Sequence, residues 1–200
     1  MADSSKNDSV LVKIYTKLDS EYVVALFNHP SLEFYRYILW SSTNHGEERM
    51  TIPLHNWLDY GAEFMARNRG QFRRLDSLYG TDSTIVTSIL KKETYFGHYP
   101  GNYGVVNSLY SLYIHFPQRK KEWAGRNLAF GIMMAKKQGL SPTDLIINFT
   151  GSNRAAFGAP QFLFESYVRW GADGDHDGRV NLYNNEKDII VTRLENSIEI

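Results

Sequence analysis

One glutamate stands out as a side chain that could transfer protons. Glu93 follows Ile89 by four residues and Ile85 by eight, so a helical repeat places it on their apolar stripe. A carboxylate on such a stripe loses water, which favours its protonated form, and the negative end of the helix dipole acts in the same direction. Both effects predict a general acid near neutral pH. The alternative is a structural glutamate paired with a lysine or arginine, and spacing alone favours that alternative.

An acidic segment near the end of the chain has the residue types of a cation site. Residues 173–184 read DGDHDGRVNLYN, which matches the start of a calcium-binding loop, with Gly178 at the sixth position for the sharp turn. Asn184 stands where a bidentate carboxylate is expected, and Glu186 or Asp188 could replace it in a longer loop. The alternative is a solvated acidic turn. The expected early ligands are Asp173, Asp175, Asp177 and the carbonyl of Arg179.

Several aromatic residues could stack on sugar rings, although the protein core is the better expectation for any one of them. They are Tyr95, Phe96, Tyr99, Tyr103, Phe157, Phe162 and Tyr167. Other chemistries lack a pattern, because the six histidines have no zinc spacing and no nucleophile elbow or phosphate-binding glycine loop occurs. With no cysteine, thiolate catalysis and disulfides are excluded.

The composition narrows the class of protein. Of the 200 residues, 42% are apolar and 14% aromatic, enough for a folded core. Lys plus Arg and Asp plus Glu both number 22, a balance that argues against a nucleic-acid carrier. No stretch approaches the about 18 apolar residues of a membrane span. The polar residues 1–9 are expected to form a disordered lead without the apolar core of a signal peptide.

The elements that must position these residues are mostly helices. Pro53 suits a first helical turn, Gly80 a helix end, and Asp82 a cap for the helix that carries Glu93. Apolar spacing predicts a further helix at the end of the chain, and loops around 151–160 and 173–184. The expected helical or apolar segments are 10–18, 22–27, 32–40, 53–68, 71–78, 83–96, 105–115, 122–137, 162–170 and 189–198.

Three blocks in this order resemble one known family. They are YG…ILKKETYFG (residues 79–97), GSNRAAFGAPQF (151–162) and DGDHDGRVNLYN (173–184). Together they resemble the soluble catalytic region of the type B membrane-bound lytic murein transglycosylases, and looser similarity begins near residue 10. The family is expected to continue past Ile200 with a helical segment that closes the sugar site, and Arg154 replaces an expected small residue.

The resemblance implies a mainly α fold of the lysozyme-like α+β superfamily, a helical bundle-like domain with an EF-hand-like calcium loop. Residues 10–70 would form the N-terminal helical part, and 71–200 the catalytic core with its calcium loop at 173–188. The implied activity is cleavage of the MurNAc–GlcNAc bond of peptidoglycan. One glutamate, matched by Glu93, would protonate the glycosidic oxygen and then take the proton of the C6 hydroxyl, which closes a 1,6-anhydro ring. Most glycosidases instead use two carboxylates.

The resemblance also implies further site residues. Ser152, Gln161 and Phe162 match positions that line the glycan cleft, and Arg119 matches a basic residue facing the glycan or its peptide. Tyr95, one of the aromatic stacking candidates, is also expected to bind the substrate. The implied metal is a structural Ca²⁺, with Asp188 as the remote ligand. No cofactor is implied for catalysis.

The implied partners are peptidoglycan glycan strands, with envelope or secretion-machinery proteins as further candidates. No nucleic acid and no transmembrane segment are expected. The implied location is the periplasm or the cell envelope. Three other functions stay open: a goose-lysozyme-like muramidase that uses water, a catalytically weak peptidoglycan-binding or assembly module, and a calcium-responsive structural domain.

Overall fold

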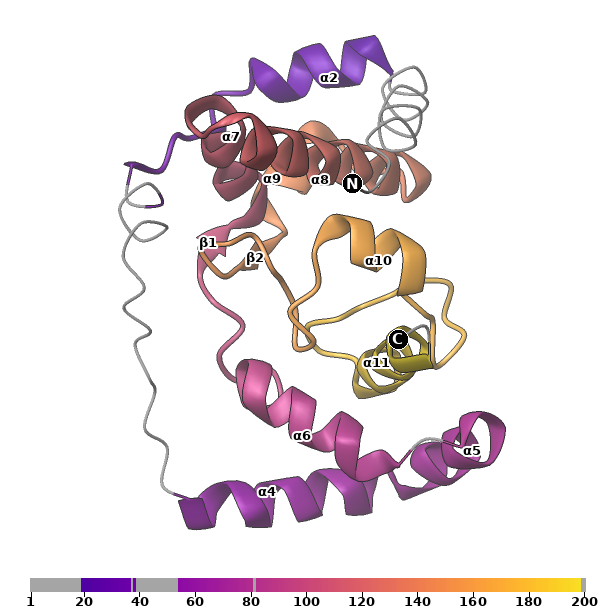
Figure 1. The fold of residues 1–200 in the computed structure, drawn as a ribbon. Coiled ribbons are helices and arrows are strands. Elements are labelled where there is room, and N and C mark those ends of the chain that lie inside the picture. The colour runs from indigo at the N-terminus through magenta and orange to yellow at the C-terminus, as the bar shows by residue number, and fades with distance from the viewer. Residues whose placement is uncertain (1–18, 37, 39–53, 81, 199–200) are drawn as a thin grey trace, which may run out of the picture. The chain divides into compact units, whose positions relative to one another are not determined.

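The computed structural model describes residues 19–36, 38, 54–80 and 82–198, and this part of the chain is mainly helical (Figure 1). The expected disordered lead and the expected segment 10–18 lie outside the described residues. None of the helices in the described ranges combines the length and the apolar character that crossing a membrane requires.

The chain divides into two compact units, each built from separate segments. The first unit takes its described residues from segments 1–45, 102–156 and 163–168, and the second from 46–101, 157–162 and 169–200. The boundaries expected at residues 9 and 70 stay predictions.

Helices α7 (Val105–His115) and α8 (Gln118–Lys137) pack together in the first unit, with α2 (Ser20–Phe27) and α9 (Pro142–Ile147) beside them. Gly131 permits close packing, because a Cβ there would lie 2.8 Å from a ring carbon of Phe164. The small sheet pairs β1 (Tyr103–Gly104) with β2 (Thr150–Gly151) in antiparallel fashion, Tyr103 opposite Gly151. Helix α10 (Phe164–Trp170) begins in this unit.

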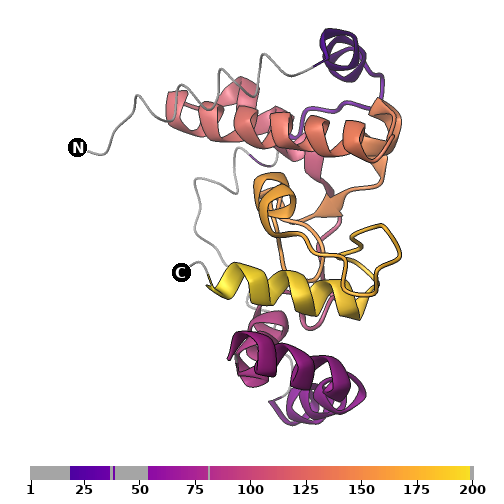
Figure 2. The same ribbon diagram turned by 90° about the vertical axis from the view of Figure 1, so that its right-hand side faces the viewer.

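The second unit contains α4 (Leu54–Arg67), α5 (Arg69–Tyr79), α6 (Ser83–Thr94) and α11 (Glu186–Ile198). Helix α11 packs against α5 and α6 (Figure 2). The core of the unit includes Phe64, Phe72, Val86, Leu90 and Ile190. As expected, Gly80 ends α5 with φ of 63°, and the Asp82 side chain caps α6 by accepting from Thr84 N.

The structure differs from the sequence-based expectations in two places. Leu32–Tyr35 is not helical, because the amides of Glu33 and Tyr35 donate to the side chains of Asn107 and Ser111 rather than to a helical ladder. Helix α9 was not expected, although Ser141 and Asp144 form a capping box at its start.

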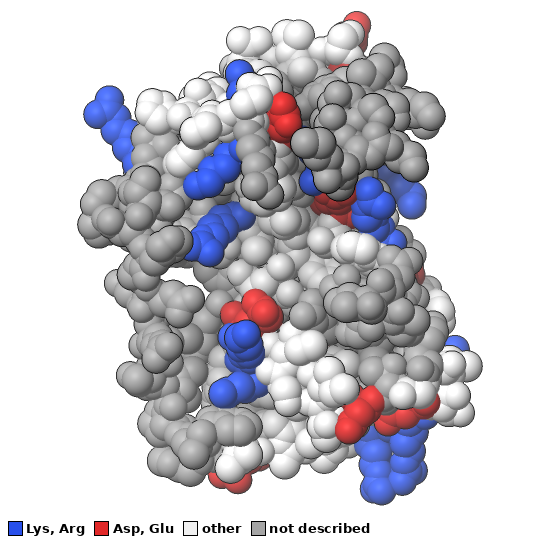
Figure 3. Space-filling model, viewed as in Figure 1, with Lys and Arg blue, Asp and Glu red and all other residues white. Residues whose placement is uncertain are grey.

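The face of the molecule drawn in Figure 3 is mixed in charge. On the face drawn in Figure 3, basic and acidic side chains lie among each other and neither sign forms a continuous patch over the residues coloured there. This agrees with the equal numbers of basic and acidic residues in the sequence.

Candidate active site

Glu93 is the penultimate residue of α6, and its side chain is exposed. The expectation that it lies on the buried stripe is wrong. The buried stripe runs through Val86, Leu90 and Thr94, whereas Ile85 is 51% exposed. The stripe that begins at Ile85 and the stripe that begins at Val86 both fit a helical repeat, and the stripe that begins at Val86 packs into the core. Desolvation by the core therefore gives no support to Glu93 as an acid.

Among the described residues, the Glu93 carboxylate also has no partner of the kind that a structural role would require. Across the described ranges, no side chain forms a hydrogen bond or ion pair with it. Its orientation is set by the helix end, and the next three residues, Tyr95, Phe96 and Gly97, have φ of 52°, 59° and 87°. Left-handed backbone at two non-glycine residues is uncommon and must be held by surrounding contacts.

Parts of the three sequence blocks meet within the second unit, through the Thr94 hydroxyl and through backbone amides and carbonyls. Thr94, 2% exposed, donates from Oγ1 to the carbonyl of Ala159 at 2.8 Å and accepts from Gly97 N at 2.8 Å. Ala159 N in turn donates to the carbonyl of Leu182 at 2.7 Å. A Cβ at Gly158 would lie 2.7 Å from the Leu182 Cβ, so only glycine allows this approach. Segments 93–97, 158–162 and 182–183 are therefore joined around the residue after Glu93.

Two predicted glycan-binding residues belong to this joined region. Gln161 has φ of 54° and donates from Nε2 to the carbonyls of Pro100 and Gly158, at 3.0 and 3.1 Å. Phe162 is only 3% exposed and forms a bridge with Phe157. Gln161 is therefore fixed in place by its amide, while Phe162 supports the loop from inside. Contact of either residue with a glycan stays a prediction.

The other two predicted glycan-binding residues belong to the first unit. Ser152 is half-buried and closes a tight turn, with its N donating to the carbonyl of Ala156 at 2.7 Å and its Oγ accepting from Ala156 N at 3.2 Å. Arg119 lies in the first turn of α8. Their roles also stay predictions.

The aromatic candidates separate into core residues and surface residues. Phe157 and Tyr167 are buried, at 0% and 7% exposure, whereas Tyr99 is 52% exposed. Tyr95 lies next to Tyr99, with ring centroids 6.2 Å apart. Tyr95 also stacks on Tyr60 of α4 at 5.7 Å. Sequence reasoning missed Tyr60, because nothing in its spacing connects it with Glu93.

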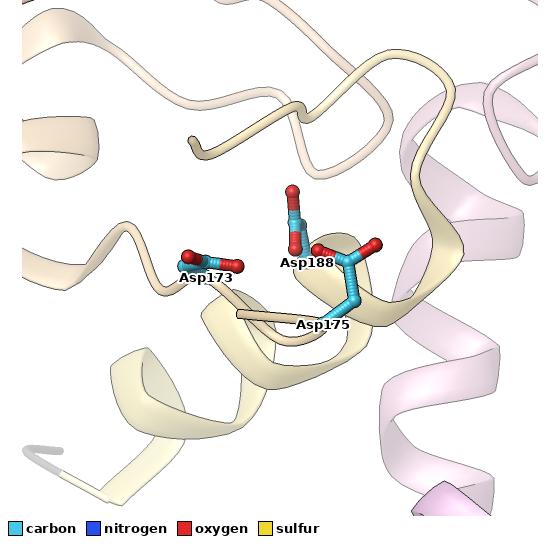
Figure 4. A group of neighbouring side chains, drawn as sticks. All are labelled: Asp173, Asp175 and Asp188. Carbon is cyan, nitrogen blue, oxygen red and sulfur yellow. The ribbon is translucent and has the colours of Figure 1, made fainter. Parts of the chain in front are cut away.

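Three carboxylates converge at the start of α11, as Figure 4 shows. Oxygen atoms of Asp173, Asp175 and Asp188 lie within 4.8 Å of one another. Calcium holds its oxygen ligands at about 2.3–2.6 Å, so two ligands on opposite sides of the ion are about 5 Å apart. The oxygen donors and their spacing fit such a cation.

Asp188 is the buried member of this group, with 0% exposure. Its two oxygens accept from Gly174 N at 2.8 Å and Asn181 N at 2.7 Å. Burial is the main cause that raises the pKa of Asp188 above its ordinary value, and the negative charges of Asp175 and Asp173 act in the same direction. Among the described residues, no lysine or arginine forms an ion pair with Asp188, and a bound cation would supply a positive charge.

The rest of the loop follows the expectation in part. Gly178 has φ of 90°, as the sharp turn requires. Asp177 is not in the group of three, and its Oδ1 accepts from Arg179 N at 2.8 Å. Glu186, the other candidate for the remote ligand, pairs with Arg67 at 2.6 Å instead. Ligation by Asp177 and by the Arg179 carbonyl stays a prediction.

The described residues are mainly helical and present an exposed carboxylate, that of Glu93, at the end of α6. The family model described as "Transglycosylase SLT domain" matches residues 52–193. The chain belongs to this family. A curated relative, membrane-bound lytic murein transglycosylase B of Escherichia coli (strain K12), is 27% identical in an alignment over 143 residues, and the match covers 66% of this chain and 38% of the relative.

Solved structures share the fold. The soluble lytic transglycosylase SltB1 from Pseudomonas aeruginosa superposes with a TM-score of 0.78 at 25% identity, over 94% of this chain and 63% of that one. SltB3 from the same organism, in complex with NAG-NAM-pentapeptide, superposes with a TM-score of 0.74 at 18% identity, and the match covers 94% of this chain and 50% of that one. The Escherichia coli Slt35 structure in complex with calcium superposes with a TM-score of 0.64 at 22% identity, and the match covers 94% of this chain and 55% of that one. The chain thus spans less than two thirds of the length of each of these proteins.

Proposed function

We propose that this protein is a lytic transglycosylase that cleaves the MurNAc–GlcNAc bond of peptidoglycan. The observation that carries the proposal is the meeting of the three blocks beside Glu93, in a chain that belongs to the transglycosylase SLT family. An exposed carboxylate at a rigid helix end can reach a polymer that comes from solution. A bound glycan would then displace the water around that carboxylate, because the protein core does not shield it.

Glu93 acts twice in the proposed reaction. Its carboxyl proton passes to the glycosidic oxygen as the bond from C1 of MurNAc to that oxygen breaks, which leaves Glu93 as a carboxylate. The C6 hydroxyl of the same MurNAc then bonds to C1 and gives its proton to Glu93. No water is consumed, and Glu93 returns to its starting state. The attacking hydroxyl belongs to the substrate, so its effective concentration greatly exceeds that of an external nucleophile.

In the second unit, Gln161 and Tyr95 are proposed to bind the glycan directly, because they lie in the segments joined to the end of α6. Ser152 and Arg119, which belong to the first unit, are proposed as glycan-binding residues of that unit. Phe162, which is buried, is proposed to shape the glycan site through the loop that carries Gln161. Glycan strands in the periplasm or cell envelope are the proposed partner, and envelope or secretion-machinery proteins are further candidate partners.

A structural Ca²⁺ is proposed at the carboxylates of Asp173, Asp175 and Asp188. Their oxygen donors, the buried Asp188 and the sharp turn at Gly178 support this assignment. When bound, the ion would neutralise the three charges and tie the loop to α11. Asp177 and the Arg179 carbonyl complete the proposed ligand set of an EF-hand-like loop.

Digestion of purified peptidoglycan sacculi tests the function. The wild-type protein is expected to release fragments, and Glu93→Gln is expected to lower the rate by at least about 100-fold, since it removes the only proposed acid and base. Glu63→Gln is a matched control, because it makes the same change at another exposed position of the second unit. Sacculus binding without any release by the wild type would instead favour the binding or assembly module.

A further inference from the structure

The turn after Glu93 needs support from outside itself. Tyr95 and Phe96 both adopt left-handed backbone, at φ of 52° and 59°, although neither is a glycine. Thr94 fixes the turn from the core side through its bonds to Ala159 and Gly97. The aromatic side of the turn faces a different element, helix α4.

Tyr60 of α4 contacts this aromatic side at three points. Its ring stacks on Tyr95 with centroids 5.7 Å apart and an interplanar angle of 28°. The Phe96 and His98 rings lie 5.1 Å from it, and the Tyr60 hydroxyl and His98 Nε2 are 2.9 Å apart in a hydrogen bond. One side chain therefore contacts three of the five residues that follow Glu93.

Tyr60 is itself held from a second direction. Two helical turns further along α4, Arg67 lies over its ring at 5.3 Å and donates from Nη2 to its hydroxyl at 3.4 Å. Arg67 also forms a forked pair with Glu186, at 2.9 Å from Nε and 2.6 Å from Nη2. Glu186 is the first residue of α11 and accepts from Asn68 Nδ2 at 2.6 Å as well. The chain of contacts runs from α11 through Arg67 and Tyr60 to the turn.

We propose that Tyr60 is a positioning residue for Glu93 and acts through the turn at Tyr95–His98. The Glu93 carboxylate has no partner of its own among the described side chains, so its direction depends on the end of α6. Contacts that fix this turn therefore fix where the proton is delivered. The proposal rests on the proposed function, since it assigns Glu93 the proton transfer.

The test compares Tyr60→Leu, Tyr60→Phe and Tyr110→Leu in rate and in stability. Tyr110 is a matched control, because it is a half-buried tyrosine of the first unit whose ring contacts Phe27 rather than the turn. Tyr60→Leu removes the ring contacts and is expected to lower kcat for sacculus digestion roughly 10-fold to 100-fold with little change in KM. Tyr60→Phe keeps the rings and loses two hydrogen bonds, so a loss of about fivefold or less is expected. Tyr110→Leu is expected to keep the wild-type kcat.

Amide hydrogen exchange of residues 94–99 gives a second readout that does not need activity. Exchange there is expected to rise in Tyr60→Leu and not in Tyr110→Leu. A folded Tyr60→Leu protein with wild-type kcat, or with unchanged exchange in this segment, overturns the proposal. If the wild-type protein releases no fragments at all, the proposed function fails, and the exchange data still decide whether Tyr60 holds the turn.

Discussion

At the scale of single residues, Glu93 and Thr94 divide the work at the end of α6. The first points outward as the proposed acid and base, and the second points into the core and fixes the backbone beside it. A neighbouring pair with opposite burial lets one helix end both anchor the fold and present a reactive group. The position of Glu93 thus depends on Thr94, a side chain buried in the core.

Replacing Thr94 tests this anchor. Thr94→Val keeps the shape but leaves the Ala159 carbonyl and Gly97 N–H without their partner, so a loss of about 2–4 kcal/mol of unfolding free energy is expected. The control is Thr87→Val in the same helix, which removes only a bond to the Ser83 carbonyl and is expected to cost about 1 kcal/mol or less. Urea denaturation measures both, and equal losses in the two variants would contradict the assigned role of Thr94.

At the scale of elements, the start of α11 is tied to α4 through charge. Burial raises the pKa of Glu186, but its bonds from Arg67 and Asn68 outweigh that effect and hold the pKa below its ordinary value. A carboxylate with a lowered pKa stabilises the fold above the ordinary pKa of about 4.5, and this contribution disappears as the pH falls through the lower folded-state value. The α4–α11 connection is therefore expected to weaken in acid.

Glu186→Gln tests this pH dependence. The variant is expected to lose about 1 kcal/mol or less at pH 7, since the pair is more than a third exposed to solvent. The difference from wild type should begin to shrink as the pH falls below about 4.5, where the unfolded chain takes up the proton, and should vanish as the pH falls through the lower folded-state pKa. Unfolding free energies over this pH range provide the measurement. If the stability difference between wild type and variant grows in acid, the predicted direction of the pH dependence is wrong.

The loop before α11 provides a second element-scale prediction. Saturating Ca²⁺ is expected to raise the melting temperature by about 5 °C or more over chelator, because binding to the native state at about 100 times Kd contributes about 2.7 kcal/mol. Asp175→Asn should reduce this rise and leave the melting temperature in chelator nearly unchanged, since Asp175 is exposed. Asp59→Asn, at an exposed position of α4, is the control. An identical melting curve with and without Ca²⁺ would contradict the proposed Ca²⁺ site.

At the scale of the whole molecule, the sequence predicts most helices because their signals are local. Gly80 and Asp82 mark the boundary between α5 and α6 through their own backbone and side-chain preferences. The incomplete acidic pattern left Glu186 and Asp188 as candidates for the remote ligand, and the structure places Asp188 with Asp173 and Asp175. These features depend on residues close together in the chain.

The features that were missed depend on tertiary contacts. The burial of α6 could not be read from its pattern, because the stripe through Ile85 and the stripe through Val86 are equally apolar. Only the packing of α6 within its unit decides between them and turns Glu93 outward. Tyr60 lies 33 residues before Glu93, and neither its type nor its spacing reveals the contact with Tyr95.

The most direct test of the central claim is the mass of the glycan ends released from sacculi by the wild-type protein. If Glu93 returns the proton of the C6 hydroxyl, each new MurNAc end is a 1,6-anhydro ring and is one water lighter than a reducing end. Release of such ends, lost in Glu93→Gln and kept in Glu63→Gln, is the predicted result. Reducing ends in their place would mean that water attacks, as in a muramidase, and would contradict the proposed mechanism.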